Sequence, residues 1–163
     1  MQLAELYAAH GREQEALALI KDHMHGVHQD SPYVLFTYAL IQFQNHDHAG
    51  ARATIAKLEA VSDSVRRRER ALLKARIAAA LGEEPAATDQ LRDACRGYLG
   101  EEARYRYAAH LQHTARPREA LTVADEGIAF FKGSERLYRR QERPWFRGLK
   151  AVRAAAKKEL KAI

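Results

Sequence analysis

The sequence has few of the features that mark secreted or membrane-spanning proteins. Its 163 residues include one cysteine, Cys95, which cannot form a disulfide within the chain, and its neighbours Ala94 and Arg96 give no metal-ligand spacing. No apolar run reaches the roughly 18 residues that a membrane-spanning helix needs, and there is no signal peptide. These absences predict a soluble chain in a reducing compartment, which we take to be the cytoplasm.

The sequence also has little that favours β-structure. Runs of β-branched residues bounded by turns are nearly absent, and there are only four prolines and nine glycines. Alanine, leucine, glutamate, arginine and lysine are abundant, and all five favour helices. With 47% hydrophobic residues, the chain can bury a continuous core as one domain or one short array. We therefore predict an all-α fold.

Residues that would carry catalysis are scarce. The only serines, Ser31, Ser62, Ser64 and Ser134, each lie near a turn or a helix cap, and none has a nucleophile-elbow context. No phosphate-binding loop is present, and the acidic pairs Glu83-Glu84 and Glu101-Glu102 lie where they would complement a helix dipole. We expect no enzyme activity and no cofactor.

Eight histidines invite a metal-binding interpretation, above all His23, His25 and His28 with His46 and His48. Ligands on one helix must lie three or four residues apart to converge, whereas residues two apart point in nearly opposite directions. We expect no metal site and interpret these histidines as solvated loop residues.

Alanines recur in a regular pattern along the chain. They form four pairs, each twelve residues apart: Ala4 and Ala16, Ala39 and Ala51, Ala75 and Ala87, and Ala108 and Ala120. Seven residues after each first alanine lies a candidate turn, at Gly11, His46, Gly82 and Ala115. A period of about 34 residues is typical of stacked helical hairpins, whose paired helices touch through small residues.

Caps, glycines and prolines delimit the predicted helices. They span residues 1–10, 12–25, 32–44, 47–61, 85–98, 101–113 and 117–131, followed by a short helix before Pro144 and a longer one from Pro144 to Lys161. Between residues 61 and 85, the run Ser62-Asp63-Ser64 offers caps for a long helix that Gly82 ends.

Four segments resemble the tetratricopeptide repeat (TPR) family: LAELYAAHGREQEAL, YALIQFQNHDHAGARATI, ARIAAALGEEPAATDQL and YAAHLQHTARPREALTVA. The resemblance covers residues 1–131 and implies a right-handed α-solenoid of about four TPR-like helical hairpins. Residues 132–163 would form a basic amphipathic helical cap. More narrowly, the run from Tyr138-Arg139-Arg140 to Trp145 resembles bacterial TPR proteins with a membrane-anchoring segment upstream. That resemblance implies an alternative location, as a soluble fragment of a membrane-anchored bacterial protein.

In this fold class, a partner peptide lies on the concave side of the array, where the first helix of each hairpin faces inward. We therefore expect a non-catalytic scaffold that binds a protein or peptide ligand. The predicted groove consists of Tyr33, Phe36, Leu40, Phe43, Leu72, Arg76, Tyr105, Ala109 and Gln112. The alternative for Phe36 and Phe43 is ordinary core packing, because an apolar helical stripe usually packs.

Positive charge is concentrated at the C-terminus. Residues 132–163 hold 11 Lys and Arg against 3 Asp and Glu, whereas residues 1–131 hold 16 against 18. We interpret this segment first as a capping helix with a basic outer face. The alternative is a peripheral membrane-associated or nucleic-acid-binding adaptor, with nucleic acid the less favoured. Contacts with an anionic surface would then come from Arg139, Arg140, Arg143, Arg147, Lys150, Lys157 and Lys161.

Overall fold

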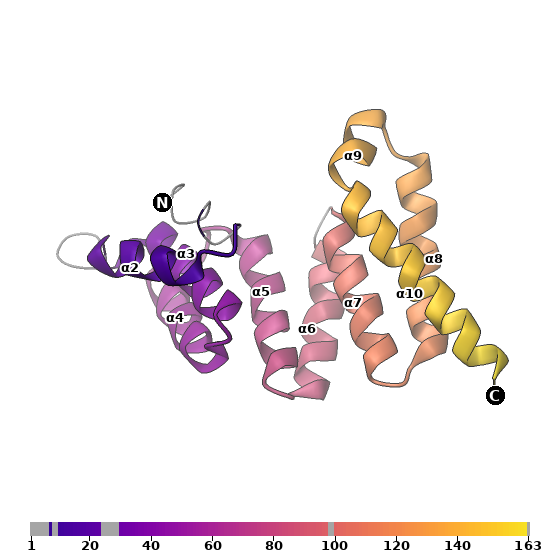
Figure 1. The fold of residues 1–163 in the computed structure, drawn as a ribbon, viewed down its shortest axis with the longest axis horizontal. Coiled ribbons are helices and arrows are strands. Elements are labelled where there is room, and N and C mark those ends of the chain that lie inside the picture. The colour runs from indigo at the N-terminus through magenta and orange to yellow at the C-terminus, as the bar shows by residue number, and fades with distance from the viewer. Residues whose placement is uncertain (1–6, 8–9, 24–29, 98–99, 163) are drawn as a thin grey trace. The chain divides into compact units, whose positions relative to one another are not determined.

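The computed structural model describes residues 7, 10–23, 30–97 and 100–162, and these residues form helices joined by short connections (Figure 1). The elements are α2 (Glu13–His23), α3 (Pro32–Gln44), α4 (His48–Val61), α5 (Arg67–Ala80), α6 (Glu84–Gly97), α7 (Glu101–His113), α8 (Pro117–Gly133), α9 (Arg136–Gln141) and α10 (Arg143–Lys161). The chain divides into two compact units, residues 1–83 and 84–163. The all-α prediction is confirmed, and the predicted domain boundary at residue 131 stays a prediction.

In the first unit, α2, α3, α4 and α5 pack against their neighbours in chain order. The core between α3, α4 and α5 contains Leu35, Phe36, Ala39, Ala51, Ile55, Leu58, Leu73 and Ile77. Buried Gln42 links the first two of these helices, because its amide donates to the Asp47 carboxylate and accepts from the Thr54 hydroxyl. Asp47 also caps α4 by accepting from the backbone N–H of Gly50.

All four predicted turn residues adopt positive φ angles: 73° at Gly11, 63° at His46, 76° at Gly82 and 55° at Ala115. This left-handed conformation ends a helix sharply and is costly for residues that carry a Cβ atom. The same backbone turn therefore recurs at each predicted hairpin, whether or not glycine occupies it.

The described alanines of the four pairs are buried. The seven that the structure describes have no exposed surface: Ala16, Ala39, Ala51, Ala75, Ala87, Ala108 and Ala120. Ala4 lies outside the described residues. Between α3 and α4, and between α7 and α8, small side chains at these positions let the two packed helices approach each other closely.

One helix begins later than predicted. The sequence offers Ser62, Asp63 and Ser64 as caps, but α5 begins at Arg67, and its N-cap residue is Arg66, with a φ of 44°. Buried Arg70 explains the difference, because its guanidinium donates to the backbone carbonyls of Ser62 and Asp63, at 2.6 and 2.8 Å. These two bonds hold the connection outside the helix.

In the second unit, α6, α7 and α8 pack in sequence, and α10 packs against both α7 and α8 (Figure 1). The face of α10 that carries Leu149, Val152 and Ala156 is buried. Two glycines allow this close approach. A Cβ atom at Gly127 would lie 2.7 Å from Leu149, and one at Gly148 would lie 2.6 Å from the ring of Tyr105. The C-terminal amphipathic helix thus covers the last predicted hairpin, as a capping helix does.

Candidate functional site

The first-unit residues of the predicted groove form a stripe along α3. Tyr33 is 59% exposed, Leu40 and Phe43 are half-buried, and Phe36 is 3% exposed. Spacings of three and four residues place these side chains on one helix face. Phe36 belongs to the hydrophobic core, so the core interpretation holds for this residue.

Two arginines cover the aromatic rings of this stripe. The guanidinium of Arg66 lies 5.1 Å from the ring centroid of Phe36, and that of Arg76 lies 4.6 Å from the ring centroid of Phe43. A cation over an aromatic face is attracted by the ring quadrupole. The surface at these points therefore presents guanidinium groups above aromatic rings, a feature that the one-dimensional pattern does not reveal. Leu72, the remaining predicted groove residue of α5, is buried.

The second-unit members of the predicted groove are engaged by α10. The rings of Tyr105 and Trp145 lie 5.7 Å apart, and the Gln112 amide donates to the Glu159 carboxylate. Ala109, between them on α7, is half-buried. The C-terminal helix therefore contacts part of the surface that the sequence predicts as a peptide groove. Sequence periodicity predicts which face of α10 is buried, but not where that face lies along α7.

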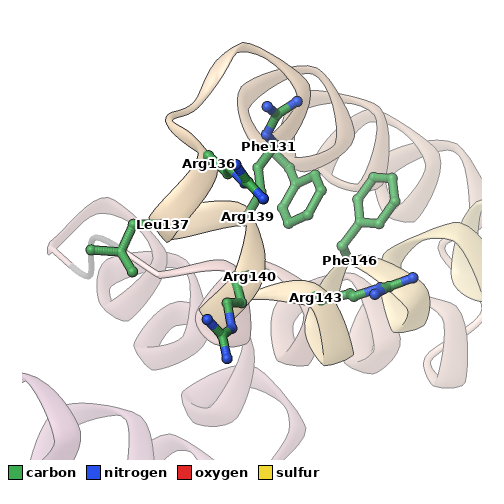
Figure 2. Close-up of a pocket in the computed structure, with 7 residues that line it drawn as sticks. All are labelled: Phe131, Arg136, Leu137, Arg139, Arg140, Arg143 and Phe146. Atoms are coloured by element: carbon green, nitrogen blue, oxygen red, sulfur yellow. The ribbon is translucent and has the colours of Figure 1, made fainter.

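A basic cleft lies among the C-terminal part of α8, α9 and the start of α10. Its volume is about 890 Å³, and it is lined by Phe131, Arg136, Leu137, Arg139, Arg140, Arg143 and Phe146 (Figure 2). The rings of Phe131 and Phe146 stack face to face, with centroids 4.0 Å apart and planes inclined by 10°. Leu137, on the short α9, is 66% exposed. The basic cleft combines apolar surface with four guanidinium groups.

Within the described residues, none of these four guanidiniums forms an ion pair or a hydrogen bond with a carboxylate. Figure 2 shows Arg136 and Arg139 near Phe131, and Arg143 near Phe146. Sequence reasoning had placed Arg139, Arg140 and Arg143 on a basic surface but missed Arg136 and the apolar side chains. Arg136 could have been included in this surface from the sequence, because it lies one helical turn before Arg139 and Arg140.

The other predicted cationic contacts lie along α10 outside the basic cleft. Arg147, Lys157 and Lys161 are exposed, and the ammonium of Lys150 lies 5.1 Å from the ring centroid of Phe146. Of the predicted cationic contacts on α10, only Arg143 lines the basic cleft.

Buried Glu101 fixes the position of α9. Its Oε1 atom accepts hydrogen bonds from the Tyr138 hydroxyl and from Arg104, each at 3.1 Å, while its Oε2 atom is buried without a partner. Burial raises the pKa of Glu101, with a smaller opposing effect from Arg104. Burial, followed by the nearby Glu101 charge, raises the pKa of Tyr138 well above its usual value. Glu142 adds a second link by accepting from the backbone N–H of Glu101 at 2.8 Å.

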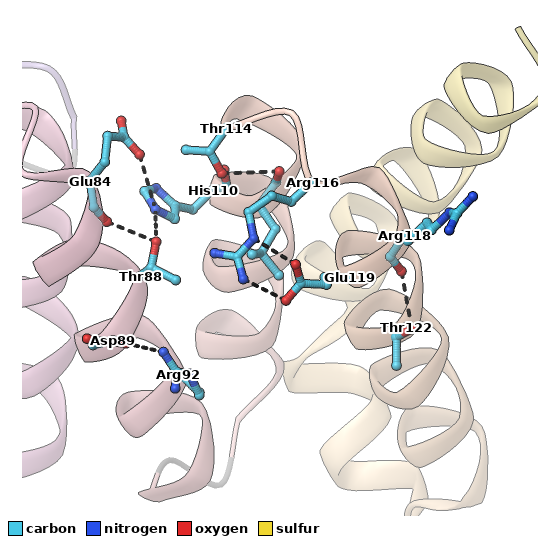
Figure 3. A network of polar contacts seen from close by, with 11 residues as sticks. Glu84, Thr88, Asp89, Arg92, His110, Thr114, Arg116, Arg118, Glu119 and Thr122 are labelled. Carbon is cyan, nitrogen blue, oxygen red and sulfur yellow. Dashed lines mark hydrogen bonds and ion pairs between the residues drawn. The ribbon is translucent and has the colours of Figure 1, made fainter. Parts of the chain in front are cut away.

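A second, smaller cleft of about 350 Å³ carries paired charges instead. It is lined by Glu84, Pro85, Thr88, Asp89, Arg92, Thr114 and Arg116. Apart from Pro85, these residues belong to the polar network in Figure 3. Arg92 pairs with Asp89, and Arg116 pairs with Glu119. Because Arg92 and Arg116 already have carboxylate partners, this cleft lacks the unneutralised positive charge of the basic cleft.

Buried His110 belongs to the same network. Its Nε2 atom lies 2.9 Å from the Thr88 hydroxyl, which itself donates to the Glu84 carbonyl. Burial lowers the pKa of His110, and the nearby Glu84 carboxylate opposes that effect. This arrangement favours a neutral imidazole that joins α6 to α7.

Among the described residues, no group of three or more histidine, cysteine, aspartate or glutamate side chains could hold a metal ion. The side chain of His23, and all of His25 and His28, lie outside the described part of the chain. In the described part, no helix has the length and apolar character needed to cross a lipid bilayer.

The arrangement of helical hairpins matches solved structures over nearly the whole chain. Two crystal structures of nearly identical TPR-like repeats from a proposed kinesin light chain of Podosopora anserina align with TM-scores of 0.65. They share 16% and 17% sequence identity with this chain, and the alignments cover 98% and 97% of it and 94% and 93% of those structures. The chain has a TPR-like repeat fold.

The crystal structure of MamA gives a similar result, with a TM-score of 0.64, 15% identity, and coverage of 99% of this chain and 98% of MamA. No protein-family model and no curated protein sequence matches the chain. The TPR-like fold therefore rests on the shared arrangement of helices and not on sequence identity.

Proposed function

We propose that this protein is a non-catalytic scaffold that binds a segment of another protein on the stripe formed by Tyr33, Leu40 and Phe43 of α3 and by Arg76 of α5. TPR-like arrays typically serve as protein-interaction scaffolds, and their stacked hairpins create extended binding surfaces. The observation that carries the proposal is the exposure of Tyr33, at 59%, at the end of a stripe in which Leu40 and Phe43 are half-buried.

The chemistry of the stripe suits a neutral peptide with apolar or aromatic side chains. Tyrosine and arginine are over-represented among the residues that dominate binding energy at protein interfaces. The guanidinium of Arg76 already lies over the ring of Phe43, so its planar face is held in place before a partner arrives. A bound aromatic or aliphatic side chain would contact Tyr33 and Leu40 without displacing the core.

The test is a selection from a displayed peptide library without aspartate or glutamate, performed on the full chain. Omitting acidic residues keeps the basic cleft from dominating the selection. Recovered peptides are synthesised, and their Kd is measured by fluorescence anisotropy against the parent and against Tyr33→Ser and Arg76→Gln. Val61→Ser is the control, because Val61 is also an exposed apolar residue of the first unit, at 48%.

We expect each of the two stripe substitutions to weaken binding by about 10-fold, equivalent to about 1.4 kcal/mol, and Val61→Ser to leave it within about 2-fold. Circular dichroism melting curves check that the variants fold. The proposal is wrong if the recovered peptides bind all four proteins equally, or if no peptide binds more tightly than about 1 mM.

A further inference from the structure

We propose that the basic cleft of the second unit is a separate binding site for an acidic segment of a partner protein, in which one apolar side chain lies between carboxylates. This site is distinct from the α3 and α5 stripe and goes beyond the proposed function. It differs in its helices, its charge and the chemistry of its ligand.

Charge complementarity is the first argument. Arg136, Arg139, Arg140 and Arg143 surround one opening, and within the described residues none of them has a carboxylate partner. Two acidic residues adjoin these arginines in sequence. Glu142 is directed to the N-terminus of α7, where it accepts from the backbone N–H of Glu101. Exposed Glu135 precedes Arg136 at the start of α9 and, within the described part of the chain, pairs with none of the four. Guanidinium groups match carboxylates with paired, charge-assisted hydrogen bonds. The basic cleft thus has positive charge that the protein itself does not neutralise.

The apolar surface is the second argument. Phe131 and Phe146 form a stacked base, and Leu137 is 66% exposed beside the arginines. A volume of about 890 Å³ is within the range of natural ligand sites, which combine apolar walls with a few polar groups that fix orientation. A peptide with carboxylates on both sides of a leucine, phenylalanine or tryptophan would satisfy both features.

The position of the arginines is set by buried contacts, which is the third argument. The hydroxyl of Tyr138, between Leu137 and Arg139 on α9, donates to buried Glu101 at 3.1 Å. The Tyr138 and Phe130 rings also pack in a T-shaped arrangement, with centroids 5.7 Å apart. A short helix held by such contacts presents its cations in a fixed arrangement, so that less entropy is lost on binding.

Nucleic acid and membrane fit this surface less well. Base binding without sequence preference needs exposed aromatic faces, but Phe131 and Phe146 stack on each other, and Lys150 lies 5.1 Å from the centroid of the Phe146 ring. A membrane surface is contacted by several apolar side chains that project into the lipid. Of the apolar residues of the basic cleft, Leu137 is 66% exposed, whereas Phe131 is 7% exposed. Both ligands are included in the test.

The experiment measures binding of fluorescein-labelled peptides to the full chain by anisotropy, at low and moderate salt. The probes are acidic peptides of alternating Asp and Glu with a central Leu, Phe or Trp. One control peptide replaces the central residue with Ser, and another replaces the acids with Asn and Gln. Vesicles containing phosphatidylglycerol and a mixed-sequence oligonucleotide are measured in the same buffers.

The variants separate a specific site from general positive charge. Arg139→Gln/Arg143→Gln removes two cations from the basic cleft, and Lys157→Gln/Lys161→Gln removes two exposed cations elsewhere on α10. We expect the first pair to weaken binding of the acidic apolar peptide by about 10-fold and the second by less than about 2-fold. Both control peptides should bind at least about 5-fold more weakly than the parent peptide.

Equal losses from the two variants would show general charge attraction and overturn the proposal. So would the absence of binding by every acidic apolar peptide at about 1 mM. Preferential binding of vesicles or oligonucleotide that is lost in Arg139→Gln/Arg143→Gln would assign the basic cleft to a different ligand and would also overturn it. None of these outcomes affects the test at Tyr33 and Arg76, because those substitutions lie in the other unit.

Discussion

Ala115 is predicted to destabilise the turn that it occupies, and replacing it with glycine should stabilise the second unit. Its φ of 55° lies in the left-handed region, and its side chain is exposed. The substitution Ala115→Gly therefore removes one exposed methyl group. Any change in stability then reports the backbone conformation.

The magnitude follows from two opposing effects. A residue with a Cβ atom costs roughly 1–2 kcal/mol in the left-handed region. Glycine removes this cost, but it loses roughly 0.5–1 kcal/mol more conformational entropy on folding than alanine, because it has more freedom in the unfolded chain. We expect Ala115→Gly to raise the free energy of unfolding by about 0.5–1 kcal/mol, which for a unit of this size corresponds to a rise in Tm of about 4 °C.

The assay is urea unfolding followed by circular dichroism, with two controls. Gly82→Ala introduces a Cβ atom at a φ of 76° with no atom within 4 Å, so it should lower stability by about 1 kcal/mol through the backbone alone. Ala154→Gly makes the same chemical change as Ala115→Gly in the exposed interior of α10, where it should cost about 1 kcal/mol. The reasoning is refuted if Ala115→Gly is no more stable than the parent while Ala154→Gly shows its expected loss.

Two further predictions concern the packing and the pH dependence of the second unit. Gly148→Ala should lower the free energy of unfolding by about 1–3 kcal/mol, because its Cβ atom would lie 2.6 Å from the Tyr105 ring. The control Gly97→Ala, whose Cβ atom would meet no atom within 4 Å, should raise the free energy of unfolding by up to about 1 kcal/mol. Equal urea midpoints for the two variants would contradict this packing. Burial raises the pKa of Glu101 above its ordinary 4.5, so its contribution to stability is fully present below that value and is lost as the pH rises through the folded-state pKa. The urea midpoint of Glu101→Gln should therefore rise relative to that of the parent between about pH 4.5 and 7. If the difference between the two midpoints stays constant or shrinks as the pH rises, burial does not destabilise the charged form of Glu101.

The hairpin repeat could be predicted from the sequence because its two main signals are local. Small residues are needed where helices touch, and turn residues recur at a fixed distance from them. Even His46 and Ala115, which carry a Cβ atom, adopt left-handed geometry at the turn positions of the repeat. Segments 32–44 and 101–113 also form helices with the predicted bounds.

The surfaces could be predicted only in part, because they depend on contacts between distant residues. Helical periodicity placed Phe36 and Phe43 on one face of α3 but could not show that Arg66 and Arg76 cover their rings. The start of α5 likewise depends on Arg70 bonding to two carbonyls in the preceding connection.

The basic cleft was missed for the same reason. Its arginines come from one stretch of sequence and were recognised as a cationic segment. Phe131, by contrast, comes from α8 and meets Phe146 only when α10 folds back on the hairpin. Charge clusters are visible in a sequence, whereas an apolar surface built from two helices requires the tertiary structure.

The most direct test of the proposed function is hydrogen exchange of the full chain with and without a peptide recovered from the neutral library. Amides are protected where a ligand stabilises the local structure. Binding to the stripe predicts slower exchange in α3 and α5, with α7, α8 and α10 unchanged. Protection confined to the second unit, or no protection at a saturating concentration of peptide, would contradict the assignment of the binding surface to Tyr33, Leu40, Phe43 and Arg76.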